Sequence, residues 1–229
     1  MEDNLKDIIN KCDDDPSAIF PLINRGEFGK VKYLLDNNIV SINTLDMNKN
    51  DVLVRLLKAG EYDLVLEYIK KRNWDVNHQN IDGDTFGHVL ATIDNSKCIK
   101  IFDALLKKKN FVPNIRNSKG QTMFDKSTNN KSLIAALKIF GDKRFTNIDL
   151  YDFKKLFNMG IDNDYYGVYS KLNNFNIILN SLSKKELQPN MKILLNRIKD
   201  NKDAIKCDIM NNNIDITKTI INTTIEEIS

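Results

Sequence analysis

The chain has 229 residues and a formal net charge of +3, which is small beside its 34 basic and 31 acidic side chains. This balance argues against a dedicated nucleic-acid binder, although a local basic face is compatible with it. Hydrophobic residues make up 41% of the chain, enough to build a packed core, so the composition excludes a disordered protein.

Cysteine usage and the absence of an apolar leader indicate a reducing, intracellular setting. Cys12, Cys98 and Cys207 are odd in number and far apart, which argues against a disulfide framework. No long apolar run follows the acidic N-terminus, so we expect neither a signal peptide nor a membrane span. We therefore expect a cytoplasmic monomer. About one residue in seven is Asn, which is typical of an AT-rich genome such as that of a large DNA virus or a protist, and a viral protein would act in the host cell.

The first predicted helix, over 17–25, follows a lead-in of residues 1–16. Asp15 is its expected N-cap, and Pro16 its first residue. Gly26 breaks it, and a second helix ends near Asn38. An extended segment, 40–43, follows. The sequence therefore begins with a pair of short helices joined by a tight break.

The same order of elements then recurs three times up to residue 141. The predicted breaks at Gly26, Gly60, Asn95 and Asn129 are about 34 residues apart, and Gly and Asn best tolerate a left-handed backbone. Asn43, Asn77 and Asn114 close successive units in nearly the same phase. Each second helix carries a predicted buried stripe at helical spacing: Val31, Leu34 and Leu35; Val65, Tyr68 and Ile69; Phe102, Leu105 and Leu106; Leu133 and Leu137.

Residues 80–91, NIDGDTFGHVLA, resemble the opening of an ankyrin repeat, a β-turn followed by T-P-L-H-x-A and two antiparallel helices. Asp82-Gly83 suits the turn, Thr85 can cap the helix and His88 lies on its first turn. Phe86 and Gly87 replace the usual Pro and Leu. The resemblance implies an all-α, ankyrin-type helical solenoid with about four repeats over 17–141. Tetratricopeptide and HEAT arrays are the alternatives, but they lack the extended V-x-N segment.

Residues 142–229 are interpreted as a degenerate repeat followed by a helical C-terminal cap, which a solenoid needs to cover its last apolar face. The ending Met159-Gly160-Ile161-Asp162 resembles the ankyrin L-L-x-x-G-A-D, and Ser183 and Glu186 have the spacing of a capping box. Residues 214–228 suit helix or strand. Two further stripes are predicted: Leu150, Phe153, Leu156 and Phe157; Met191, Leu194, Leu195 and Ile198.

The sequence offers little support for chemistry at a site. His88 and Cys98 could form a base and a nucleophile, but we expect His88 to be structural and Cys98 to pack within a helix. His78, His88 and Cys98 lack the spacing of a zinc site, and no phosphate-binding loop is found, so we expect no metal, no cofactor and no enzyme. An enzyme hidden in 142–229 is the remaining alternative, and that segment has no His and only Cys207.

The ankyrin resemblance implies protein–protein interaction through the hairpin tips and the first helices. The alternative is a binder of nucleic acid or an acidic surface through the clusters 70–72 and 107–109, which we interpret instead as favourable charge at helix C-termini. Trp74 is expected to pack under the neighbouring hairpin rather than to be an exposed anchor. The candidate contacts to a protein partner are Asn48, Lys49, Asn50, Asp82, Asp84, Lys119 and Gln121.

Overall fold

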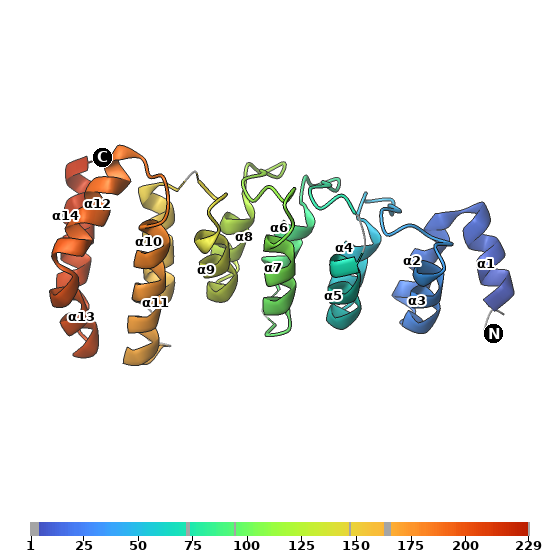
Figure 1. Ribbon diagram of the computed structural model, residues 1–229, viewed down its shortest axis with the longest axis horizontal. Helices are drawn as coiled ribbons and strands as arrows, with labels where there is room; N and C mark the ends of the chain where they lie inside the picture. Colours follow the sequence, from blue (N-terminus) through green and yellow to red (C-terminus); the bar gives the residue numbers. More distant parts are fainter. Residues whose placement is uncertain (1–4, 72–73, 94, 147, 163–165, 229) are drawn as a thin grey trace. The chain divides into compact units, whose positions relative to one another are not determined.

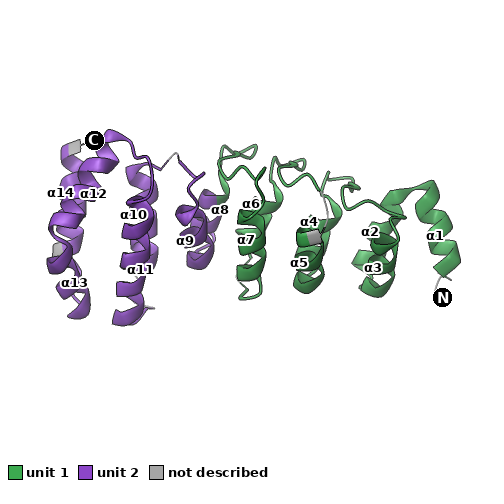
Figure 2. Ribbon diagram, viewed as in Figure 1, with its two compact units in different colours: residues 1–123 green, residues 124–229 purple. Residues whose placement is uncertain are grey.

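The computed structural model describes residues 5–71, 74–93, 95–146, 148–162 and 166–228 (Figure 1). Over these residues the protein is all-helical, as predicted, and strand geometry is limited to one isolated bridge between Leu45 and Asp51. The chain forms two compact units, residues 1–123 and 124–229 (Figure 2). Among the described residues, no helix is both long and apolar enough to cross a bilayer.

The first unit consists of short helices arranged as successive pairs. The partners in each pair, α2 with α3, α4 with α5 and α6 with α7, contact each other, and α4 contacts both α2 and α6. The loops that enter α4 and α6 lie along one edge of the unit (Figure 1). Its elements are α1 (Leu5–Asp14), the 3₁₀-helix η1 (Pro16–Ala18), α2 (Ile19–Asn24), α3 (Phe28–Asp36), α4 (Val52–Lys58), α5 (Tyr62–Lys71), α6 (Phe86–Leu90) and α7 (Cys98–Leu106).

The start of the chain differs from the sequence prediction. The expected lead-in contains α1, whose buried residues Ile8 and Cys12 are one turn apart. The side chain of Asp15 caps the next helix by accepting the Ser17 N–H at 2.9 Å, with Pro16 at the first position, as predicted. The predicted helix 17–25 is divided into η1 and α2. Leu5, Ile8 and Cys12 do recur at helical spacing, so α1 was recognisable from the sequence and the prediction missed it.

The predicted breaks are confirmed at Gly26 and Gly60, and the break predicted at Asn129 lies just after it, at the turn 130–131 that follows α8 (Met123–Asn129). Gly26 and Gly60 have φ of +73° and +83°, the left-handed region. Asn129 is instead the last residue of α8, and Lys131 is the left-handed residue, with φ of 57°. Asn95 adjoins a residue outside the described part. The left-handed residue comes directly after the last turn of α8. Its position therefore depends on where that helix ends, and the presence of an Asn does not determine this.

The predicted extended connectors are wrong, because turns lie at 42–43, 76–77 and 113–114. The turn before His78, for example, is closed by its N–H donating to the Asp75 carbonyl at 3.1 Å. The side chain of Asn77 explains the recurring asparagine. Its amide donates to the Asn110 carbonyl at 2.7 Å and its oxygen accepts the Val112 N–H at 2.9 Å, so it joins one connector to the next.

The second unit contains longer helices. The segment 214–228, for which the sequence allowed helix or strand, is helical from residue 215 onward. The elements are α8 with α9 (Leu133–Gly141), α10 (Leu150–Gly160), α11 (Val168–Leu182), α12 (Pro189–Asp200), α13 (Lys202–Met210) and α14 (Asp215–Ile228). The end of α13 fixes the start of α14, because the buried Asp208 carboxylate accepts the Thr217 N–H at 2.9 Å and its hydroxyl at 2.7 Å.

The predicted stripes are buried with three exceptions: Leu106, Leu137 and Leu150 are half-buried. In α9 the buried face is formed by Leu133, Ala136 and Ile139. This helix is apolar around most of its circumference, so the periodicity did not fix which face is inside. The stripe of α12 is confirmed in full, with Met191, Leu194, Leu195 and Ile198 buried.

The predicted capping box of Ser183 and Glu186 is wrong. Ser183 is the C-cap of α11, and its hydroxyl donates to the Leu179 carbonyl at 2.9 Å. The capping box of this unit lies instead at α10, between Asp149 and Asp152. Pro189, which is favoured at a first helical position, begins α12 without a side-chain cap.

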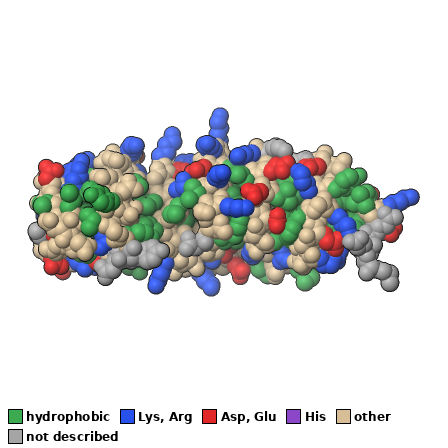
Figure 3. Space-filling model, turned by 90° about the horizontal axis from the view of Figure 1, so that it is seen from below, with side chains coloured by type: hydrophobic (Ala, Val, Ile, Leu, Met, Phe, Trp, Pro, Cys, Tyr) green, Lys and Arg blue, Asp and Glu red, His purple; other side chains and the backbone are tan. Residues whose placement is uncertain are grey.

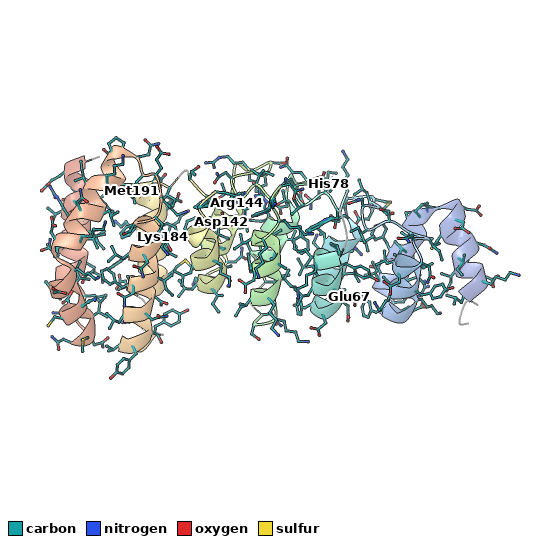
Figure 4. All side chains as sticks on the ribbon, in the orientation of Figure 1. Glu67, His78, Asp142, Arg144, Lys184 and Met191 are labelled. Carbon is teal, nitrogen blue, oxygen red and sulfur yellow. The ribbon has the colours of Figure 1, made fainter. Side chains whose placement is uncertain are left out.

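The connector after α9 is fixed by Lys185, which neighbours the labelled Lys184 of Figure 4. Its ammonium donates to the carbonyls of Asp142, at 2.5 Å, and Phe145, at 2.8 Å, and lies over the rings of Phe140 and Phe145. Burial lowers the pKa of Lys185 to about 8. The Asp142 carboxylate pairs with Arg144 at 2.7 Å. These contacts stabilise the connector between α9 and α10, which differs from the five-residue tips of the first unit.

Candidate interaction surface

Three five-residue tips in the first unit, 46–50, 80–84 and 117–121, share one turn. The first residue of each tip, Asp46, Asn80 or Asn117, accepts the N–H groups of the third and fifth residues through its side-chain oxygen, at 2.8 to 3.0 Å. Its own N–H donates to the carbonyl of the fifth residue. Asp and Asn are the residues whose side-chain oxygen makes this turn most readily, and Ser and Thr do so more weakly. We number these tip positions one to five.

Tip position four is left-handed in all three tips, with φ of 57° at Lys49, 73° at Gly83 and 72° at Gly120. Gly is the residue that adopts this conformation without a steric cost, so Lys49 is the exception. A Cβ atom added at Gly83 would lie 2.6 Å from the Ser118 nitrogen. Gly83 is therefore required both by its backbone angle and by the closeness of the next tip.

Each carbonyl at tip position four accepts a hydrogen bond from a nearby side chain. His78 Nε2 lies 2.8 Å from the Lys49 oxygen, and Gln79 donates to the Gly83 oxygen at 2.6 Å. Arg116 donates to the Gly120 oxygen at 2.6 Å. His78 is labelled among these loops in Figure 4. Three different residue types thus provide the hydrogen bond to the carbonyl at tip position four. Because these types differ, the repeat is hard to recognise in the sequence.

Successive tips are joined to each other by the same bonds. The N–H at position two donates to the carbonyl at position three of the preceding tip, from Ile81 to Asn48 and from Ser118 to Asp82, each at 3.0 Å. The side chain at position one donates to that at position five of the preceding tip. These distances are 3.0 Å from Asn80 to Asn50 and 2.7 Å from Asn117 to Asp84. The tips therefore form a continuous row with a fixed spacing.

This row separates the seven predicted contact residues into two groups. Asn48, Asp82 and Lys119 all occupy position three, and their side chains are exposed. Asn50, Asp84 and Gln121 occupy position five, where their side chains bond within the row, and Asn50 is only 2% exposed. Lys49 is exposed at position four.

The prediction also missed Met47, which is 97% exposed at position two, next to the equivalent Ile81 at 62%. Aligning the tips on Asp46, Asn80 and Asn117 would have revealed this equivalence. The exposed positions two and three are therefore the candidate contact surface, which we call the tip surface: Met47, Asn48, Ile81, Asp82, Ser118 and Lys119.

His88 ties this row to the helix that follows it. Its Nδ1 accepts the Thr85 N–H at 3.1 Å and lies 2.8 Å from the Thr85 hydroxyl, which completes a capping box. Because Nδ1 is an acceptor there, Nε2 carries the proton and donates to the Gln121 carbonyl of the next tip at 2.9 Å. The side chain is 1% exposed. This is the bridging geometry expected of a structural histidine.

Trp74 packs beneath the tips, as predicted. Its indole N–H donates to the Asp51 carboxylate at 3.1 Å, and its ring meets Phe86 edge-on at 5.4 Å. The second carboxylate contact of Asp51 is the Val54 N–H at 2.7 Å, which caps α4. Burial raises the pKa of Asp51, opposed by these hydrogen bonds. Trp74 thus links the first helix of one pair with that of the next.

A hollow of about 520 Å³ lies beside the first tip, between Met47 and Asn48 on one side and Phe20, Pro21 and Asn24 of α2 on the other. Asp46 and Arg55, which are paired at 3.3 Å, line it as well. It offers apolar carbon beside hydrogen-bonding groups, adjoining the tip surface. Over the described residues, no group of three His, Cys, Asp or Glu side chains is placed to hold a metal ion.

Comparison with known proteins adds no assignment to this geometry. No protein-family model matches the chain, and no curated protein matches it.

Proposed function

We propose that this chain is a non-enzymatic, ankyrin-type repeat protein that binds another protein through the tip surface. The observation that carries the proposal is the row of three tips, in which side-chain bonds, left-handed position and bonds between tips recur together. A row of this kind is a rigid support whose outward residues are free to differ.

The chemistry of the outward residues favours a protein partner. Position two presents Met47, Ile81 and Ser118, and position three presents an amide, a carboxylate and an ammonium group. Exposed apolar side chains beside mixed polar groups are typical of protein interfaces. Their variation from tip to tip suits one specific partner rather than a repeated ligand. The hollow beside Met47 extends this surface onto α2.

We further propose that the protein acts as a monomer in the cytoplasm. The three thiols are free, and Cys207 is exposed, which suits a reducing compartment. Within the first unit, successive helix pairs contact one another, and the tip row is built without a second copy. In this interpretation, the second unit contains the degenerate repeat and the helical cap.

The test compares partner capture by three forms of the full chain. The tip variant is Asn48→Ala, Asp82→Ala, Lys119→Ala. The control, Asn196→Ala, Asp200→Ala, Lys192→Ala, removes the same three residue types from exposed positions on α12. We expect a protein that is captured by the wild type and the control but lost with the tip variant, and that binds the purified wild type in calorimetry. Equal capture by all three forms would exclude the tip surface.

A further inference from the structure

A groove of about 420 Å³ runs between α5 and α7, the second helices of adjacent pairs. Its apolar floor is formed by Ile69 and Ala104, both buried. Its walls carry Lys70 from α5, Lys100 from α7, and Lys107 and Lys108, which directly follow α7. The fold thus brings together members of the two basic clusters, and adds Lys100, which belongs to neither. The side chain of Lys71 and residue Arg72 lie outside the described part.

The lysines of the groove differ from Lys32 of α3 and from Lys97, the N-cap of α7. Lys32 pairs with Glu67 at 2.8 Å, and Lys97 pairs with Asp63 at 2.9 Å. In the described part of the chain, the ammonium groups of Lys70, Lys100 and Lys107 make no ion pair and no hydrogen bond. Like charges gathered along one groove repel each other, and an anion placed between them removes that cost.

Favourable charge at helix ends does not account for this set. Lys70 and Lys107 lie at the C-terminal ends of α5 and α7, where a cation is stabilised. Lys100 is the third residue of α7, whose first turn contains no acidic residue. A cation is unfavourable at that end of a helix, so Lys100 needs another explanation. It lies one and two turns from Ala104 and Lys107 on one face, in the wall of the groove.

We propose that this groove binds an acidic segment of a partner polypeptide, with its carboxylates against Lys70, Lys100 and Lys107 and a small apolar side chain on the floor. The inference rests on the proposed function, because it takes the partner to be a protein, and it adds the chemistry of one contact. The groove belongs to the second helices, so it is separate from the tip surface. Lys108 is already held over the ring of Trp74, at 5.9 Å, and borders the site.

The surroundings favour a peptide over nucleic acid. Asp103 lies in the groove itself, and the neighbouring α5 carries Asp63 and Glu67, which would repel a continuous phosphate backbone. On the face shown in Figure 3, acidic, basic and apolar side chains are interspersed. A phosphate backbone is bound by extended basic surfaces, whereas a few carboxylates need only a short run of lysines. The size of the groove suits a few residues of chain.

The test measures binding of a fluorescent peptide of glutamates interrupted by alanines to the full chain, by anisotropy. The groove variant is Lys100→Gln, Lys107→Gln. The control, Lys192→Gln, Lys199→Gln, removes the same charge from exposed lysines of α12, outside both the groove and the tip surface. Losing two exposed ion pairs should weaken binding about fivefold in the groove variant, and leave the control near the wild type. Lys70→Gln, on the opposite wall, should weaken binding by itself. Affinity should fall as salt is raised, because the contacts are between charges.

Circular dichroism melts establish that each variant is folded before binding is compared. No binding of the peptide by the wild type, or equal binding by wild type and groove variant, overturns the inference. Tighter binding of a single-stranded oligonucleotide than of the peptide also overturns it, in favour of a nucleic-acid groove. The tip variant keeps the two proposals apart. If the tip variant loses the captured protein and the groove variant binds the peptide as the wild type does, the proposed function is supported. The same result contradicts the inference that the groove binds an acidic segment.

Discussion

Single residues in the tip row carry requirements that their neighbours in sequence do not reveal. Gly83 and Gly120 occupy equivalent left-handed positions, yet only Gly83 has the backbone of the next tip within van der Waals range of a Cβ atom. His88 and His78 both bond to a carbonyl of a tip, but only His88 is buried and also caps a helix. Each pair therefore offers a matched comparison.

The glycine pair predicts two different losses. Gly120→Ala should lower the free energy of unfolding by about 1 kcal/mol, the cost of the left-handed conformation for a residue with a Cβ atom. Gly83→Ala should cost clearly more, because its Cβ would lie 2.6 Å from the Ser118 nitrogen and would separate the tips. Urea unfolding followed by Trp74 fluorescence measures both. Equal losses of unfolding free energy in the two variants would mean that the two tips can move apart to accommodate the Cβ atom without loss of stability.

The histidine pair predicts a similar contrast. His88→Ala should cost about 1–3 kcal/mol, because it leaves buried partners at Thr85 and Gln121 without their hydrogen bonds. His78→Ala removes one exposed bond and should cost about 0.5 kcal/mol, the low end for a hydrogen bond. Thermal melts and partner binding are measured together. Unchanged stability with lost binding in His88→Ala would contradict its structural role.

At the scale of helices, the outcome depends on which face of each element meets its neighbour. Leu105 and Leu106 are adjacent in α7, and both belong to the predicted stripe. Leu105 is 0% exposed, whereas Leu106 is half-buried. Part of the core of the first unit lies between α5 and α7, which contact each other. Of these two residues, Leu105 is therefore expected to stabilise the packing of the helices, whereas Leu106 lies at the edge of the buried face.

Leu105→Ala should cost about 2–5 kcal/mol, because it leaves a cavity between two helices that cannot close fully. Leu106→Ala is the matched control and should cost less, since part of its side chain already faces water. Trp74 is the only Trp of the chain, so its fluorescence reports the unfolding of the first unit. The order of the two losses is the test, and its reversal would mean that the faces of α7 are exchanged.

The capping box of α10 makes the stability of the second unit depend on pH. Burial, followed by the nearby carboxylate of Asp149, raises the pKa of Asp152 to about 6, above its usual value of 3.8. Between these two values the folded form holds a proton that the unfolded chain has lost. The free energy of unfolding contributed by Asp152 therefore falls as pH rises from about 4 to about 6.

Asp152→Asn isolates this contribution from that of other carboxyl groups. The stability of the wild type relative to the variant should decline across this window and level off above it, as measured by urea unfolding followed by circular dichroism. A difference that grows with pH would show that hydrogen bonding to the ionised Asp152 outweighs its burial. That result would reverse the direction of its pKa shift.

At the scale of the whole molecule, the sequence by itself determined the helical class, the buried stripes of most helices and the caps at Asp15 and Thr85. These features depend on spacing within one helix or on one turn, so a few adjacent residues specify them. The all-α content should be visible as a mainly helical circular dichroism spectrum. The sequence also indicated the tips, since Gly83 and Gly120 mark them directly.

Tertiary structure alone decided which tip residues face outward and where the lysines meet. Asn48 is exposed, whereas the side chain of Asn50 bonds within its own tip to Asp46 and to Asn80, thirty residues later in the chain. Lys70 and Lys100 share a groove only because α5 and α7 stack. Burial and charge proximity between repeats depend on residues about one repeat away, and no local pattern encodes that pairing.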